Sequence, residues 1–291
     1  MDLDFSDLGL EVTKPKAGLE TASALFYGPV GCGKTTLATS VVDVAELSPV
    51  LVVDFENSTA SVAEQYGDHP DLDVVQVREW KKAENLIEAL CTKPHKYKTV
   101  IMDPMNNLVH LLMQHMNKLV EYKRSLLHKE SVGKITAAET AHLAKLASVK
   151  MQDNVNNSLG EATTSLADYG MIGTKMTKVI YDLNAAPFQT LFVTHANNQE
   201  DDRGRTLSIR PDMPGNVSKE RITEKPHLVG FVRKVQTKDE EGNAKTSVVV
   251  QFEGGKTAQG IPFAAKRRLN VPNTMLNPTM TDIWNHINGG K

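Results

Sequence analysis

A glycine-rich turn between an apolar run and a helical pattern constrains this chain more than any other sequence feature. The run ALFYG (24–28) predicts a buried strand, and GPVGCGKTT follows directly at residues 28–36. Two glycines separated by four residues precede Lys34 and Thr35, which is the P-loop pattern. A strand before the turn and a helix after it are the context that this motif requires. The turn therefore predicts a binding site for nucleotide phosphates rather than a chance match.

The chemistry of the motif gives each part of the turn a task. Glycines allow successive backbone N–H groups to point at phosphate oxygens, and the positive end of the following helix points at the same anion. Lys34 is expected to add a positive charge at the β- and γ-phosphates, and the Thr35 hydroxyl to bind Mg²⁺. We therefore expect ATP and Mg²⁺ as cofactors. The expected nucleotide-binding residues are Gly28, Pro29, Val30, Gly31, Cys32, Gly33, Lys34, Thr35 and Thr36.

Composition narrows the class of protein. A chain of 291 residues can form one large α/β domain or a core with an insertion. The formal net charge of -2 excludes nucleic-acid binding through overall positive charge, so any such contact must be local. Cys32 and Cys91 form neither a disulfide framework nor a metal-binding spacing. Because neither a signal-peptide pattern nor a long apolar span is present, we expect a soluble, cytoplasmic protein.

Further apolar runs follow the first at wide intervals. They are VLVVDF (50–55), DVVQV (73–77), TVIMD (99–103) and QTLFVT (189–194). Helical patterns at 34–46 and 81–91 lie between some of them. Runs that are apolar on both faces and alternate with helices predict a parallel sheet covered by helices. The expected fold class is α/β, with a mostly parallel, twisted sheet.

The interval between the last two of these runs is too long for one crossover helix. A stripe of leucines runs through NLVHLLMQHMNKLVEYKRSLL, and TAAETAHLAKLASVKM begins with Thr136 and Glu139 in capping-box spacing. We expect these helices to form an insertion over about 105–160. A third helix over about 166–184 is expected to return the chain to the sheet.

The ends of the chain differ from the core. Residues 1–20 predict a lead-in with few apolar residues, followed by a single domain over 21–291. The polar segment 197–226 is expected to be a long loop or to order on binding. A C-terminal hairpin with Gly242 at its tip is expected within a basic segment over about 227–270.

Polar residues follow three of the expected strands, whose carboxyl ends face the ligand in an open parallel sheet. Asp103 is the expected Walker B carboxylate that holds Mg²⁺. Glu56 is expected to activate the attacking water, with Asp54 as the alternative, although a solvated loop acid stays open for Glu56. Thr194 and His195 end the last strand, where a polar side chain can contact the γ-phosphate.

In this order the motifs resemble the RecA-like ATPases, and more closely the small phage-encoded RecA-like proteins that include the Sak-type single-strand annealing group. The resemblance covers residues 22 to about 290 except the insertion. GPVGCGKTT matches the P-loop, VVDFE the strand that ends in the catalytic glutamate, VIMD Walker B and FVTHA the γ-phosphate sensor. It implies catalytic roles for Glu56 and Lys34 and a sensor role for His195. It also implies a homo-oligomeric ring or filament that acts on single-stranded DNA in recombination, annealing or replication, in the host cytoplasm.

Two further sets of residues follow from the same resemblance. FAAKRRLN resembles a basic motif that reaches the nucleotide of a neighbouring subunit, which implies Lys266 and Arg268 as trans-acting candidates. In RecA-like proteins the loop after the sensor strand contacts single-stranded DNA. Its counterpart at 196–216 carries three DNA-binding candidates, Arg203, Arg205 and Arg210. The segment has no aromatic ring for base stacking, so phosphate contacts should dominate and weaken with salt.

The sequence departs from the family pattern at three places. Pro104 and Met105 follow Asp103 where relatives commonly have a small hydroxyl residue, and His195 stands where RecA has an amide. The insertion is larger than the small annealing proteins lead us to expect. These departures bear on polymer form and on the role of DNA, and leave nucleotide binding intact.

Two alternatives belong to other functional classes. The protein could be a nucleotide-controlled switch or adaptor whose helical insertion binds a protein partner and whose hydrolysis serves as a timer. A P-loop kinase is the least favoured alternative, because no arginine cluster typical of a lid occurs between the later strands.

Overall fold

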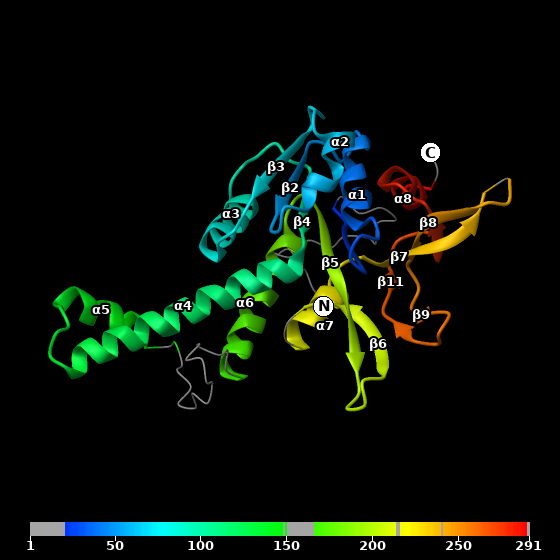
Figure 1. Ribbon diagram of the computed structural model, residues 1–291. Coiled ribbons are helices and arrows are strands. Elements are labelled where there is room, and N and C mark those ends of the chain that lie inside the picture. The colour runs from blue at the N-terminus through cyan, green and yellow to red at the C-terminus, as the bar shows by residue number, and fades with distance from the viewer. Residues whose placement is uncertain (1–20, 148, 150–165, 214–215, 240, 290–291) are drawn as a thin grey trace, which may run out of the picture.

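A twisted, mostly parallel sheet forms the centre of the computed structural model, which describes residues 21–289 except 148, 150–165, 214–215 and 240 (Figure 1). The lead-in expected at 1–20 lies outside the described residues, as does the end of the expected insertion. The strand before the glycine-rich turn, β1 (Ser23–Gly28), lies inside the sheet and is buried along its whole length. Burial on both faces explains why its sequence is a continuous apolar run.

Parallel partners flank β1 on both sides. One side carries β5 (Gln189–Glu200) and the other β7 (Leu228–Lys238). Beyond β5 the sheet continues through β4 (Thr99–Asp103), β2 (Val50–Asp54) and β3 (Leu72–Gln76), all parallel. Strand β5 therefore lies between β1 and β4, and the carboxyl ends of β1, β2, β4 and the parallel part of β5 meet at one edge. The expected α/β fold class, with a mostly parallel and twisted sheet covered by helices, is confirmed.

Helices cover both faces of the sheet and create two apolar cores. One core contains residues of α3, α4 and α6, among them Trp80, Leu108 and Ile180. The other contains residues of α1, the 3₁₀ turn after it and α8, among them Leu37 and Ile283. The helices are α1 (Lys34–Thr39), η2 (Ser40–Asp43), η3 (Ser58–Val62), α2 (Ala63–Tyr66), α3 (Trp80–Thr92), α4 (Met105–Ser131), α5 (Ala137–Lys145), α6 (Leu166–Ala185), α7 (Asn216–Glu224) and α8 (Met280–Ile287).

The helical insertion begins directly after β4. Helix α4 has 27 residues and extends away from the core, with α5 near its far end (Figure 1). The expected capping box at the start of α5 is present, since Thr136 and Glu139 each bond the other's backbone N–H. None of the helices in the described ranges has the length and apolar character that a membrane crossing requires.

The C-terminal hairpin is also confirmed. Strand β8 (Ala244–Gln251) pairs antiparallel with β7, and Gly242 in the turn between them has a φ of 85°. Shorter strands complete this end of the chain, namely β9 (Gly255–Lys256), β10 (Pro262–Phe263), β11 (Lys266–Arg267) and β12 (Thr274–Leu276).

The expectation of a long loop over 197–226 is wrong. Strand β5 continues past His195 to Glu200, and β6 (Thr206–Pro211) pairs with it antiparallel. Helix α7 follows. In Figure 1 the ribbon of β5 and β6 extends beyond the sheet. The segment after His195 is therefore a two-stranded hairpin, in which Ala196 and Ile209 pack against the core and the residues of the tip are exposed.

Candidate functional site

The glycine-rich turn has the backbone shape that its sequence requires. Gly31 and Gly33 have φ values of 69° and 97°, in the left-handed region that favours glycine. Gly28 is required for another reason, because a Cβ atom there would lie 1.9 Å from the backbone oxygen of Val232 in β7. The turn thus passes directly against the neighbouring strand before α1 begins at Lys34.

We expect Gly28→Ala to destabilise the protein, because the atom it would strike belongs to rigid backbone. Overpacking of this kind typically costs about 1–3 kcal/mol, which lowers the unfolding midpoint of a domain this large by roughly 2–5 °C. Thermal unfolding measures the effect. Gly170→Ala is the matched control, since a Cβ at Gly170 on α6 would meet nothing within 4 Å. Equal melting of the two variants would contradict the close contact.

Lys34 is held close to the turn. Its side chain is buried, and Nζ donates to the carbonyl oxygens of Gly28 at 3.1 Å and Pro29 at 2.8 Å. Burial lowers the pKa of the ammonium group, and the negative charges of Asp103 and Glu56 oppose that shift. The positive charge of Lys34 thus lies in a partly desolvated place, where an anion would interact with it more strongly than at the surface.

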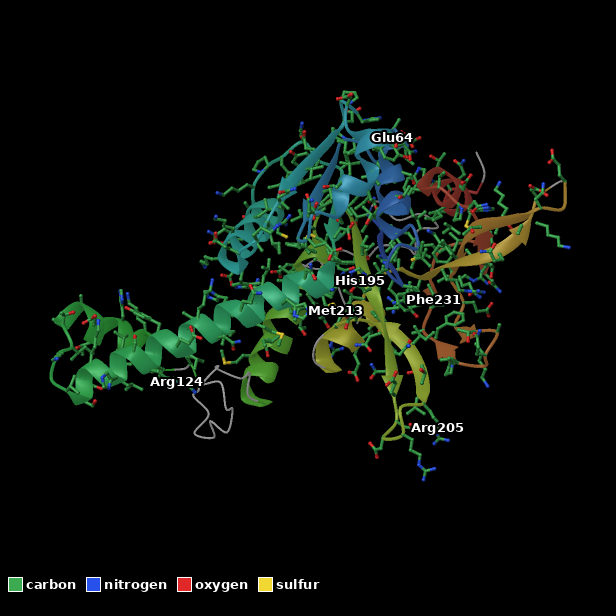
Figure 2. The ribbon with its side chains drawn as sticks, viewed as in Figure 1. Glu64, Arg124, His195, Arg205, Met213 and Phe231 are labelled. Carbon is green, nitrogen blue, oxygen red and sulfur yellow. The ribbon has the colours of Figure 1, made fainter. Side chains whose placement is uncertain are left out.

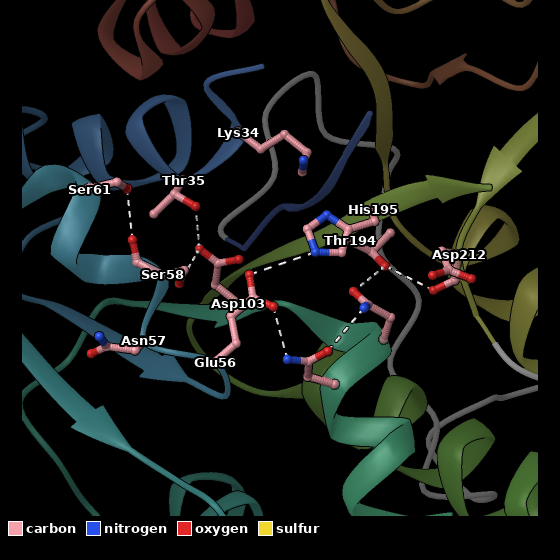
Figure 3. A network of polar contacts seen from close by, with 12 residues as sticks. Lys34, Thr35, Glu56, Asn57, Ser58, Ser61, Asp103, Thr194, His195 and Asp212 are labelled. Carbon is pink, nitrogen blue, oxygen red and sulfur yellow. Dashed lines mark hydrogen bonds and ion pairs between the residues drawn. The ribbon is translucent and has the colours of Figure 1, made fainter. Parts of the chain in front are cut away.

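Asp103 and Thr35 meet as the two motifs predict. The Thr35 hydroxyl donates to Oδ2 of Asp103 at 2.7 Å, and the Ser58 hydroxyl donates to the same oxygen at 3.1 Å (Figure 3). Burial raises the pKa of Asp103 to about 6, although both hydroxyl bonds act in the opposite direction. Hydroxyl and carboxylate oxygens are ligands that Mg²⁺ prefers, so this donor set suits the ion.

Asp54 and Glu56 differ sharply in their surroundings. Asp54 is fully buried, and its Oδ1 accepts the backbone N–H groups of Glu56 at 2.9 Å and Asn57 at 2.6 Å. The Thr59 hydroxyl donates to the other carboxylate oxygen at 2.7 Å. Although burial opposes it, hydrogen bonds from Thr59 and from the backbone hold the pKa of Asp54 below its usual value. Asp54 shapes the turn after β2, so the alternative assignment of water activation to Asp54 is not supported.

Glu56 lies between α4 and the end of the expected sensor strand. Its Oε2 accepts a hydrogen bond of 2.9 Å from Nδ2 of Asn107, and Oε1 lies 3.7 Å from Nε2 of His195. The two side chains are 33% and 22% exposed, so both are accessible from the site. Figure 3 shows Glu56 and His195 pointing toward each other beside Asp103. The other ring nitrogen of His195, Nδ1, is buried and lacks a hydrogen-bond partner among the described residues.

One cavity of about 510 Å³ connects these groups. Its lining includes Lys34, Thr35, Glu56, Asp103 and His195, together with Val30, Gly31, Gly33 and Thr36 of the turn. Five further polar residues were not expected from the sequence. Asn57, Ser58, Ser61 and Lys234 also line the cavity, and Asn107 contacts Glu56. A serine in a turn and one lysine in the alternating pattern of β7 give no sequence signal, because only the fold brings them here.

The trans-acting candidates lie away from this cavity. Lys266 in β11 pairs with Val229, near the start of β7, whereas the cavity lies at the carboxyl edge of the sheet. The Nζ atom of Lys266 donates to the backbone oxygen of Glu224 at 2.5 Å. Burial of the ammonium group and the nearby positive charge of Arg268 both lower the pKa of Lys266, to about 8. Arg268 is exposed. Neither residue belongs to the described lining of the cavity in its own chain.

The DNA-binding candidates lie on the β5–β6 hairpin. Arg203 and Arg205 are exposed at its tip, which Figure 2 marks by the label on Arg205, and Arg210 is exposed on β6. Arg205 forms an ion pair with Asp201, with Nη2 2.6 Å from the carboxylate. Because Glu200, Asp201 and Asp202 accompany two arginines, the tip is not a basic patch.

Comparison with known proteins gives two matches of different extent. Residues 20–125 match the model of a family described as an AAA domain, and this segment contains the glycine-rich turn, Glu56 and Asp103. Among solved structures, the crystal structure of the RadB recombinase is similar at 14% sequence identity and a TM-score of 0.41, over 88% of this chain and 86% of that one. A search of curated proteins gave no significant match. The segment with the turn and the carboxylates is thus similar to AAA-type P-loop domains.

Proposed function

We propose that this protein is a Mg²⁺-dependent, RecA-like ATPase that acts on single-stranded DNA as an oligomer, in recombination, annealing or replication of the phage type. One observation carries the ATPase proposal. The glycine-rich turn, the Thr35–Asp103 pair and Glu56 line a single cavity at the carboxyl edge of the sheet. The match of residues 20–125 to AAA domains supports ATP hydrolysis at the level of the family.

The residues of the cavity have different proposed roles in nucleotide binding or hydrolysis. Backbone N–H groups of the turn and the Lys34 ammonium bind the phosphates, and Thr35 and Asp103 hold Mg²⁺. When bound, Mg²⁺ neutralises charge that develops on the phosphate oxygens. Glu56 accepts a proton from the attacking water through Oε1, the oxygen that Asn107 leaves free. His195, beside Glu56, contacts the γ-phosphate.

The proposal for DNA follows from chain continuity. The strand that carries His195 runs without interruption into the β5–β6 hairpin. A change at His195 can therefore be passed along one strand to Arg203 and Arg205. Because Asp201 pairs with Arg205, a DNA phosphate must compete with that carboxylate, and binding should be weak and sensitive to salt.

The oligomer proposal rests on the trans-acting candidates. Arg268 is exposed and does not line the cavity of its own chain, so it can serve a nucleotide only in a second copy. Lys266 is the weaker of the two candidates, because its ammonium group is tied to Glu224 and partly buried.

Steady-state ATP hydrolysis with Mg²⁺, measured with and without single-stranded DNA at low and moderate salt, tests the function. We expect DNA to stimulate turnover at low salt and the stimulation to fade as salt rises. The double variant Arg203→Ala/Arg205→Ala should lose most of the stimulation, whereas Lys256→Ala, an exposed cation of β9, should retain it. Stimulation that persists in the arginine variant would contradict the role of the hairpin.

The second candidate function is a nucleotide-controlled switch. The far part of helix α4, with α5 beside it, favours the switch, because a helical arm that projects beyond the core can present a surface to a protein partner (Figure 1). The same experiment separates the two functions. Turnover that is indifferent to DNA, or nucleotide binding without turnover, would support the switch.

A further inference from the structure

The first turn of α4 approaches the candidate catalytic carboxylate. Helix α4 begins at Met105, two residues after Asp103, so its third residue lies beside the cavity. There Nδ2 of Asn107 donates to Oε2 of Glu56 at 2.9 Å. The two residues are 51 positions apart in the chain, and only the adjacent, parallel pairing of β2 and β4 brings them together.

The orientation of the Asn107 amide is fixed by a second amide. Oδ1 of Asn107 accepts a hydrogen bond of 3.1 Å from Nδ2 of Asn106, which is buried. If the Asn107 amide were flipped, its oxygen would face the Glu56 carboxylate and its NH₂ group would face the NH₂ group of Asn106. Both contacts would be repulsive, whereas both are hydrogen bonds in the observed orientation. Asn107 must therefore present its donor to Glu56.

The hydrogen bonds that begin at Glu56 continue through Asn107 and Asn106 to the sheet. Oδ1 of Asn106 accepts from the hydroxyl of Thr194 at 3.2 Å, and Thr194 is fully buried on β5. The Thr194 hydroxyl also lies 3.1 Å from the backbone oxygen of Asp212, which follows the β5–β6 hairpin. Figure 3 shows this series of contacts running from Asp212 through Thr194 toward Glu56.

We infer that Asn107 is a positioning residue for Glu56, which holds Oε2 so that Oε1 is presented to the attacking water. A glutamate side chain has several rotatable bonds, and without a partner its carboxylate samples many orientations at a half-exposed site. Anchoring one oxygen on a rigid helix fixes the other. The inference rests on the proposed ATPase function and adds to it a residue that contacts the Glu56 carboxylate and does not belong to the described lining of the cavity.

Turnover kinetics test the role of Asn107. We expect Asn107→Ala to lower kcat about 10- to 100-fold, the range that misplacement of a catalytic group produces, while KM for ATP changes less than about twofold. Asn107→Asp is nearly isosteric but replaces the donor with an acceptor, so it should lower kcat at least as far. Asn117→Ala, at a half-buried asparagine further along α4, is the matched control and should leave kcat unchanged.

A spectroscopic measurement tests the contact without turnover. In protein labelled with ¹⁵N-asparagine, the side-chain amide signals of Asn107 are those lost in Asn107→Asp. We expect these signals to shift in Glu56→Gln and to stay in place in Lys256→Ala. The inference is overturned if Asn107→Ala hydrolyses ATP at the normal rate and the side-chain amide signals of Asn107 do not shift in Glu56→Gln. If the wild-type protein does not hydrolyse ATP, the proposed function fails, and a shift of the amide signals still supports the positioning of the carboxylate.

Discussion

Replacement of Lys34 by alanine is expected to abolish tight nucleotide binding and turnover. Lys34 is the cation of the turn, and its side chain is held at the cavity by the carbonyl oxygens of Gly28 and Pro29. Loss of one preorganised charge from such a site typically lowers turnover about 10²- to 10³-fold, or about 3–4 kcal/mol of transition-state stabilisation. Equilibrium binding of a fluorescent ATP analogue and phosphate release measure the two effects.

Because Lys34 is buried, its replacement can also destabilise the protein, so the experiment must distinguish loss of the positive charge from loss of folding. Lys34→Met keeps most of the apolar stem and removes the charge, so it should behave like Lys34→Ala while packing better. Lys245→Ala removes an exposed lysine of β8 and should retain binding and turnover. If Lys34→Met melts like the wild type and still turns over ATP at the normal rate, the assignment of the phosphate site to this turn is wrong.

The parts of the site that could be predicted from the sequence are those that follow from local rules. The P-loop spacing predicts a turn with its lysine and hydroxyl, and Asp103 at the end of an apolar run belongs at the carboxyl edge of a parallel sheet. Together they predict that Thr35 and Asp103 approach each other, and the two are joined at 2.7 Å. The helix after β4 was also readable, since its leucine stripe repeats at helical spacing.

Contacts that depend on how distant elements pack could not be predicted. Asp54 and Glu56 lie two residues apart at the end of the same strand, and the sequence names Glu56 first and Asp54 as the alternative without a local rule that separates them. The structure separates them, because backbone N–H groups of the turn occupy Asp54 while Glu56 faces the cavity. Asn107 has no motif of its own, because its position beside Glu56 depends on the pairing of β2 with β4.

The β5–β6 hairpin escaped prediction for a physical reason. The polar and turn-forming residues that surround its two strands favour a loop, and the alternation of polar and apolar residues in β6 extends only over residues 206–210, which is short for a strand signal. The remaining sign is the turn itself, where Gly204 has a φ of 73° and Asp201 accepts the backbone N–H of Arg205. A glycine two residues after an aspartate within DDRGR is a turn signal that polar composition obscured.

Glu56→Gln should preserve nucleotide binding and largely stop hydrolysis. Glutamine has the size of glutamate, and its side-chain oxygen can still accept from Asn107, so the shape of the cavity is kept. It cannot accept the proton of the attacking water. Loss of a general base typically lowers kcat about 10²- to 10⁴-fold, or about 3–5 kcal/mol, and we expect affinity for the ATP analogue to stay within about threefold.

The comparison with Asp54→Asn makes this test specific. Asp54 accepts N–H groups of the turn, so its substitution should lower the unfolding midpoint as well as turnover, whereas Glu56→Gln should melt like the wild type. Single-turnover measurements with saturating protein separate the chemical step from product release. A Glu56→Gln protein that hydrolyses ATP at the wild-type rate would remove Glu56 from the mechanism. Because Asp54 is already committed to the turn, His195, 3.7 Å from Glu56, would then be the next residue to substitute.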